Sequence, residues 1–316
     1  MTDLVNTPPR SQWAEVWHQF KHHRGAMFGA FVFLFLVAAV YLGPLIWNVD
    51  PQFLPRGRDF LDLRDTRPIY VALWDSGAKV NWAHPLGTDN LGRDTLARLL
   101  FGGRVSIAVG LTAMVLSVVL GALVGILAGF FRRLDGPLMR LTDLFLALPL
   151  LPLILVASLL FREALAARFG PEGGVFVLIV VLIGLTSWMQ TARIVRGDVL
   201  ALKEREFVLA ARSIGTTDTR LITRHMLPNI LSPILVSATL GIATAIITES
   251  ALSFLGFGFP PDFPTWGRLL NDGVTRLSSY PERSILPGLL ISLTVLSVNY
   301  LGDGLRDALD PRVRGR

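Results

Sequence analysis

Long apolar runs alternate with short polar segments along this chain of 316 residues. A helix needs about 20 apolar residues to cross a bilayer, and six of the runs approach or exceed that length. The first, 26–47, ends on Trp47, a residue that favours the membrane interface. The pattern therefore predicts an all-α polytopic membrane protein with six transmembrane helices, the other five lying at about 105–131, 138–161, 175–194, 229–248 and 285–301.

The distribution of basic residues predicts how the chain is oriented. The short segments assigned to the inside hold 17 arginines and lysines, and the two short outside segments hold 5. Because basic residues favour cytoplasmic loops, both termini are expected in the cytoplasm. The predicted parts are a cytoplasmic segment (1–25), a first transmembrane helix (26–47), an extracytoplasmic loop (48–103), a five-helix core (104–303) and a cytoplasmic tail (304–316).

Composition supports the membrane assignment and excludes some chemistry. Hydrophobic residues make up 52% of the chain and charged residues only 17%, with a mean hydropathy of +0.52. The chain has no cysteine, which excludes a disulfide, a thiolate nucleophile and a cysteine-based metal site. The net charge of +6 is explained by cytoplasmic loops and anionic lipid headgroups, so no nucleic-acid partner is expected.

The segment 204–228 is an arginine-rich polar island between apolar runs. Phe207, Ala210, Ala211 and Ile214 follow the spacing i, i+3, i+4, i+7. That spacing predicts a short helix with one apolar face that has two small residues at its centre.

A turn and a second helix are expected after that helix. Gly215 should end the first helix, because glycine tolerates the left-handed conformation found at helix ends. Thr217 or Asp218 can cap the second, and Pro228 either ends it or begins the next one. This arrangement predicts a knob on the cytoplasmic surface that docks into a groove of another protein.

The same island resembles the EAA loop of permease subunits of bacterial ABC importers. That motif reads Glu-Ala-Ala, three residues, Gly, nine residues, Ile, one residue, Leu-Pro. Leu209 replaces its Glu and His225 its Ile, and the run 224–229 is similar to the peptide-importer branch. The alternative is an amphipathic loop of another membrane protein. The resemblance implies a coupling helix that sits in a cleft of a separate ATPase subunit, with Phe207, Ala210, Ala211, Arg212, Ile214, Gly215, Leu227 and Pro228 as the coupling residues.

A second motif lies in the segment 84–94, which leads into leucines at 96, 99 and 100. Its residues predict a turn followed by an amphipathic helix along the bilayer. With no nucleophile nearby, helix capping and local ion pairs explain its charged groups better than catalysis does. The segment also resembles the Gly-Thr-Asp-x-x-Gly-Arg-Asp motif of the peptide-importer permease with the longer N-terminal extension, through Gly87, Thr88, Asp89, Gly92, Arg93 and Asp94.

A third motif, in 251–273, also resembles the peptide-importer permeases. Ser-Phe-Leu-Gly-Phe-Gly at 253–258 precedes Pro-Thr-Trp-Gly at 264–267. An apolar, glycine-rich re-entrant or interfacial loop is expected here, because irregular backbone at membrane depth must line a cavity or be covered by protein.

Several residues inside the predicted helices are candidates for packing or transport. Gly121, Gly125 and Gly129 share one helix face and allow a close helix approach, either for self-association or within a permease dimer. Asp143, Pro149 and Glu249 are candidate pathway or gating residues, since acidic groups and prolines in membrane helices often mark such sites. Asp143 is also close enough to the interface to bond to a loop.

Together the three motifs identify the chain as similar to type I ABC importer permeases of the dipeptide and oligopeptide systems, in the bacterial inner membrane. The chain lacks a Gly-x-x-x-x-Gly-Lys-Ser/Thr loop, so ATP hydrolysis is expected on another polypeptide. We therefore expect a non-enzymatic subunit with no metal or cofactor of its own. The resemblance implies a second permease, one or two ATPase subunits that bind ATP and Mg, an extracytoplasmic binding protein, and membrane lipid as partners.

Two other functional classes fit the sequence less well. A secondary transporter or channel should carry ionisable positions near the bilayer centre, often in two matching halves, whereas the apolar runs hold almost no charge and show no such halves. A membrane-embedded enzyme should cluster a nucleophile, base or metal ligands, and no such cluster stands out. Within the family, nickel chelates and glutathione-like compounds are alternative substrates to peptides.

Overall fold

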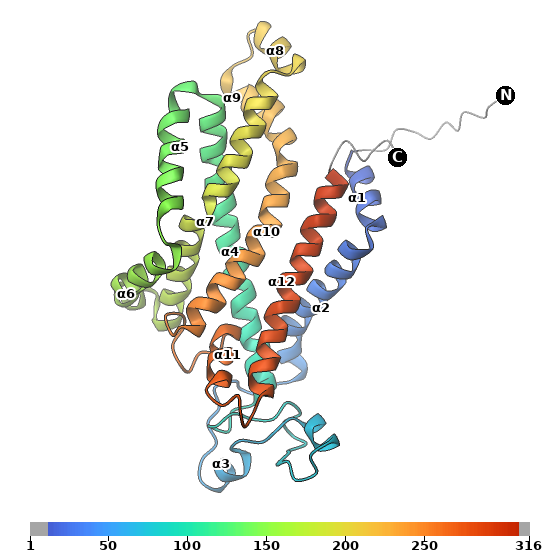
Figure 1. Cartoon of the computed structure of the whole chain (residues 1–316), viewed down its shortest axis with the longest axis vertical. Coiled ribbons are helices and arrows are strands. Elements are labelled where there is room, and N and C mark those ends of the chain that lie inside the picture. The colour runs from blue at the N-terminus through green and yellow to red at the C-terminus, as the bar shows by residue number, and fades with distance from the viewer. Residues whose placement is uncertain (1–11, 310–316) are drawn as a thin grey trace, which may run out of the picture.

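The computed structural model describes residues 12–309, which form a bundle of long helices (Figure 1). Within that range the backbone forms no strand, only two isolated β-bridges. Residues 1–11 and most of the predicted tail, 310–316, lie outside the described range.

Within residues 12–309, six helical segments are long and apolar enough to cross a membrane, which confirms the predicted number. Most are longer than the apolar runs, because their polar ends continue the helix beyond the hydrocarbon core. The segments are α2 (Arg24–Ile46), α4 (Thr95–Phe130), α6 (Leu150–Phe169), α7 (Pro171–Lys203), Asp218–Phe254 with α10 (Leu227–Phe254) as its main part, and α12 (Glu282–Leu309).

Short elements lie at the two ends of the bundle. At one end are α1 (Gln12–His22), α8 (Glu206–Ser213) and α9 (Asp218–Arg220), together with the last turns of α12 (Figure 1). At the opposite end are α3 (Arg58–Leu63), in the long loop after α2, and α11 (Trp266–Val274); the 3₁₀ helix η1 (Ile69–Leu73) belongs to the same loop. The polar island and the long loop are therefore separated as the predicted topology requires.

The structure differs from the expected amphipathic helix at 94–100. Those residues form the first turns of α4, a continuous helix of 36 residues. Asp94 caps its N-terminus by accepting a hydrogen bond from the Ala97 amide at 2.6 Å. Leu99 is buried with Val40 and Trp266. The leucine face therefore packs into the bundle, where it buries more apolar surface than it would at the bilayer interface.

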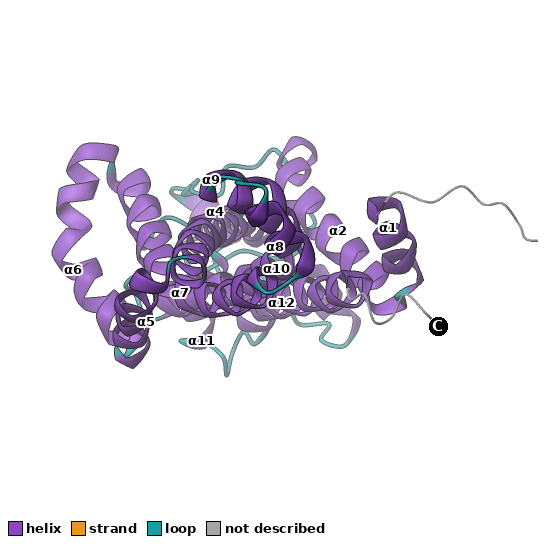
Figure 2. Cartoon of the chain, turned by 90° about the horizontal axis from the view of Figure 1, so that it is seen from above, coloured by secondary structure: helices purple, strands orange, loops and turns teal. Residues whose placement is uncertain are grey.

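The third apolar run is divided into two helices, α5 (Arg132–Ala147) and α6. Leu148 between them is extended, with φ −75° and ψ 135°, and Pro149 precedes α6. A residue before proline avoids the helical conformation for steric reasons, so the predicted break falls at this point. Seen from above, α6 lies at the edge of the bundle (Figure 2).

The glycine stripe of α4 packs against α7 of the same chain. A Cβ added to Gly121 would lie 2.7 Å from the carbonyl oxygen of Trp188, and one on Gly129 would lie 2.8 Å from Cβ of Val199. The stripe therefore serves packing within one subunit. This differs from our expectation of self-association or a contact between two permeases.

Candidate functional site

The polar island folds as a helix, a glycine turn and a second helix that project beyond the bundle (Figure 1). Gly215 follows α8 with φ +82°, the left-handed conformation expected there. Thr217 precedes α9 in an extended conformation. We call residues 204–228 the knob.

The two sides of α8 have different surroundings. Val208 and Ala211 are buried in one cluster with Leu221. Leu221 belongs to the segment that leads from Gly215 back to α10, residues 216–226, which we call the return segment. Ile214 is 84% exposed and Phe207 is 44% exposed. The predicted apolar face is therefore split, and Ala211 packs onto its own chain where we expected it to face a partner. The reason is that the return segment lies directly against this helix of 8 residues.

The outward side of the knob remains apolar in part. Phe207, Leu209 and Ile214 are its large exposed hydrophobic side chains, and Ala210 is exposed beside them. Arg212 is also exposed, and its guanidinium lies 6.0 Å from the ring centre of Phe130. This surface has the composition of a protein-contact patch.

Within the knob, a π-helical turn, η2 (Leu221–Met226), leads into α10. Such turns are rare and occur frequently at functional sites. His225 lies in the turn, and its carbonyl accepts a hydrogen bond from the Asn229 side chain at 2.6 Å. Leu227 and Pro228 form the first turn of α10, so the proline begins that helix. No sequence pattern we know would have predicted the π-helical turn.

A cavity of about 240 Å³ opens near the middle of the bundle. It lies between α4, α7 and α10, beside the break between α5 and α6; Leu148 and Leu150, on either side of Pro149, both line it. Its polar lining comes from Ser117, Thr186, Ser187, Gln190, Ser237 and Thr244, among others. Sequence reasoning missed these residues because they are spread over three separate apolar runs.

The candidate pathway acids lie in different places. Asp143 of α5 forms an ion pair with Arg193 of α7 at 2.5 Å, and both side chains are more than half exposed. Glu249 of α10 is fully buried and accepts a hydrogen bond from the Ser253 hydroxyl at 2.7 Å. Glu249 is not among the residues that line the cavity, and its role in the pathway stays a prediction.

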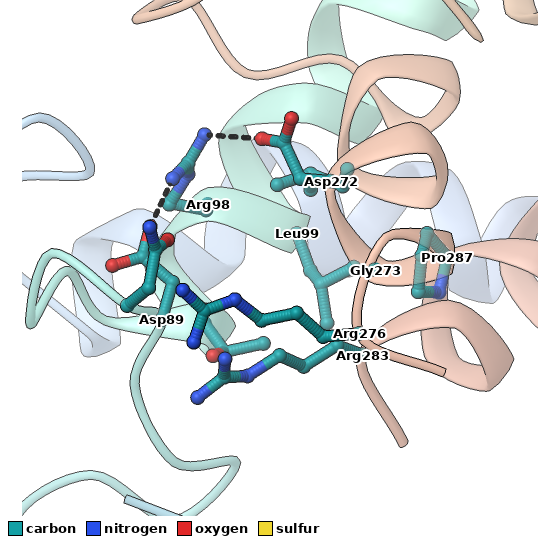
Figure 3. A pocket seen from close by; sticks show the side chains of 11 residues that line it. Asp89, Arg98, Leu99, Asp272, Gly273, Arg276, Arg283 and Pro287 are labelled. Atoms are coloured by element: carbon teal, nitrogen blue, oxygen red, sulfur yellow. Dashed lines mark hydrogen bonds and ion pairs between the residues drawn. The ribbon is translucent and has the colours of Figure 1, made fainter. Parts of the chain in front are cut away.

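The 84–94 segment forms a charged network at the opposite end of the bundle from the knob. Asp89 accepts hydrogen bonds from the Arg93 amide at 2.9 Å and the Arg93 side chain at 2.7 Å. It also pairs with Arg98, which is only 1% exposed and whose guanidinium lies 3.7 Å from Asp272 (Figure 3). Burial alone would raise the pKa of Asp89, but the guanidinium groups of Arg98 and Arg93 hold it below its ordinary value.

The same network ties the long loop to the helices. Asp94 accepts a hydrogen bond from Nε1 of Trp47 at 3.1 Å as well as capping α4. Arg67 donates to both carboxylate oxygens of Glu282, at 3.0 and 3.2 Å. Burial raises the pKa of Asp272, although the positive charges of neighbouring arginines act to lower it. These contacts are the helix cap and ion pairs that we expected.

The remaining motif residues shape the turns of this network. Gly87 and Gly92 have φ of +72° and +78°, which explains the two glycines of the motif. The hydroxyl of Thr88 lies 2.8 Å from that of Thr66. Every motif residue therefore has a structural role within this end of the molecule.

Comparisons with known families and proteins agree over nearly the whole chain. Residues 105–315 match the family described as binding-protein-dependent transport system inner membrane component. Residues 11–63 match the N-terminal TM domain of oligopeptide transport permease C.

Two relatives match over more than nine-tenths of their length. The chain is 38% identical to the di/tripeptide transport system permease protein DppC of Pseudomonas aeruginosa, covering 95% of this chain and 92% of the relative. It is 34% identical to the oligopeptide transport system permease protein OppC of Bacillus subtilis, covering 99% and 93%. A chain of the MetNI methionine ABC transporter in an inward-facing conformation has a TM-score of 0.52 at 17% identity, over 66% of this chain and 94% of that one. That likeness supports the fold.

Proposed function

This chain belongs to the family of binding-protein-dependent transport system inner membrane components, and we propose that its substrates are peptides. It is a multi-pass permease subunit of an ABC importer in the inner membrane. The support is the match to relatives named for di/tripeptide and oligopeptide transport, which extends over at least 92% of both chains.

The proposed mechanism rests on the continuity between the knob and the cavity. α8 follows α7 after two residues, and η2 leads directly into α10. Both α7 and α10 line the cavity. A displacement of the knob by a partner would therefore move two of the cavity's walls. In this way the closure of an ATPase pair would shift the helices between inward-open and outward-open packings.

The partners follow from the same proposal. The exposed side chains of Phe207, Leu209 and Ile214 would occupy a groove of an ATPase subunit, which places the knob in the cytoplasm. ATP and Mg would bind to that subunit, and this chain would hydrolyse no ATP. A second permease would complete the path, and a binding protein would deliver peptide at the opposite end.

Uptake by the assembled importer tests this function. The complex, reconstituted in liposomes with its partner permease, ATPases and binding protein, should import labelled di- or tripeptide only when ATP is supplied to the knob side. Import of a nickel chelate or glutathione in place of peptides would contradict the substrate assignment. ATP-independent import would contradict the transporter class.

A further inference from the structure

The cavity between α4, α7 and α10 differs from its surroundings in its chemistry. Seven of its lining side chains end in a hydroxyl or an amide, and none of the described residues that line it is ionisable. Gln190 lies near the middle of α7, and Ser237 lies near the middle of the span 218–254. Polar groups are costly in hydrocarbon unless they are satisfied. Polar groups of this cavity that lack a partner inside the protein are therefore available to a polar occupant.

Most of these hydroxyls already have partners inside the protein. Thr186 donates to the carbonyl of Leu182 at 2.6 Å, and Thr191 and Ser237 bond to each other at 2.7 Å across α7 and α10. Ser117, Ser187 and Gln190 bond to no other described side chain, and of these three only Gln190 is exposed. A glutamine amide offers both donors and an acceptor, which complement a peptide bond.

The apolar part of the lining is adaptable. Met189 and Phe145 line the cavity with the leucines beside the α5–α6 break. Methionine is flexible and polarisable, so it adapts to side chains of different shape. The nearest ion pair, Asp143 with Arg193, joins α5 to α7 about one turn nearer the knob, and its two charges offset each other.

We propose that this cavity is a station where a peptide in transit is held by its main-chain amides, with the Gln190 amide as the principal contact. The proposal rests on the proposed function, and it adds where this chain holds the peptide and which side chain contacts it. Because none of the described residues that line the cavity is ionisable, the station does not discriminate between acidic, basic and neutral peptides.

Substitution of Gln190 tests the station in the reconstituted complex. Gln190→Leu should lower the uptake of a neutral tripeptide about tenfold, the effect of one lost hydrogen bond to the moving substrate. Complex assembly and basal ATP hydrolysis should stay at wild-type level. Thr112→Val is the matched control, because the Thr112 hydroxyl bonds to the carbonyl of Ala108 at 2.7 Å and does not line the cavity. Equal uptake by Gln190→Leu and Thr112→Val would overturn the proposal.

A charge placed in the station provides a second readout, which does not depend on overall activity. Relative to the wild-type ratio, Gln190→Glu should lower uptake of an acidic tripeptide against a basic one by about tenfold or more. The same ratio in variant and wild type would overturn the proposal. If wild type imports no peptide of any charge, the proposed function itself fails.

Discussion

A Cβ added to Gly125 of α4 would lie 2.6 Å from the carbonyl oxygen of Ala192 in α7. Real Cβ atoms essentially never approach that closely, and the obstacle is backbone, which cannot rotate away. The two helices therefore pack at a distance that only glycine permits at this position.

Gly125→Ala should destabilise the permease by about 2 kcal/mol, since overpacking a tight contact costs about 1–3 kcal/mol. The measurement is thermal unfolding of the purified protein in detergent. Gly136→Ala is the matched control, because Gly136 of α5 has no atom within 4 Å of the added Cβ. It should be neutral or stabilising by up to about 1 kcal/mol, the helix preference of alanine over glycine. Equal stability of the two variants would contradict the close packing.

The ion pairs of Asp89 predict a pH-dependent contribution to stability. Its pKa in the folded protein is lowered, so the charged form stabilises the fold. That stabilisation is fully present above the unfolded-state pKa of about 3.9 and is lost as the pH falls through the lower folded-state pKa. Asp89→Asn should therefore lower the unfolding temperature clearly at pH 7 and less near pH 3, where part of the stabilisation is already lost.

Asp262→Asn provides the comparison for that experiment. Asp262 also approaches Arg93, at 3.6 Å, but its side chain is 86% exposed, and exposed ion pairs contribute little. Its substitution should change the unfolding temperature little at either pH. If Asp89→Asn lowers the unfolding temperature equally at both pH values, the shape of this residue and not its charge explains its role.

The two sides of α8 should respond differently to an added charge. Ile214→Asp places it on the exposed side, so the permease should stay folded while ATPase binding and transport fall. Ala211→Glu buries a charge against Leu221, at a cost of several kcal/mol, so this variant should be unstable even without partners. Unfolding temperature, ATPase co-purification and transport, measured together, distinguish the two effects. Instability in Ile214→Asp and normal folding in Ala211→Glu would reverse our assignment of the faces.

Single cysteines can establish which end of the bundle faces the cytoplasm, because the natural chain has none. Ser76 lies in the long loop and Ser213 in the knob, and both are exposed. In intact cells, an impermeant thiol reagent should label Ser76→Cys but not Ser213→Cys. Permeabilised cells should show labelling of both. Labelling of Ser213→Cys from outside would contradict the proposed orientation.

The sequence by itself determined the six membrane helices and the family. Hydropathy along a run depends only on neighbouring residues, and a motif depends only on their order, so neither needs the tertiary structure. The turn at Gly215 and the break at Pro149 were predictable for the same reason, since they arise from the local conformational limits of glycine and proline.

Only the tertiary structure decided which surfaces these helices present. Helical spacing groups Ala211 with Ile214, yet the return segment covers Ala211 and leaves Ile214 exposed. The cavity around Gln190 combines residues from runs far apart in the chain, each of which looks like an ordinary apolar helix by itself. A side chain's role depends on what packs against it, and in a helical bundle those neighbours come from other parts of the chain.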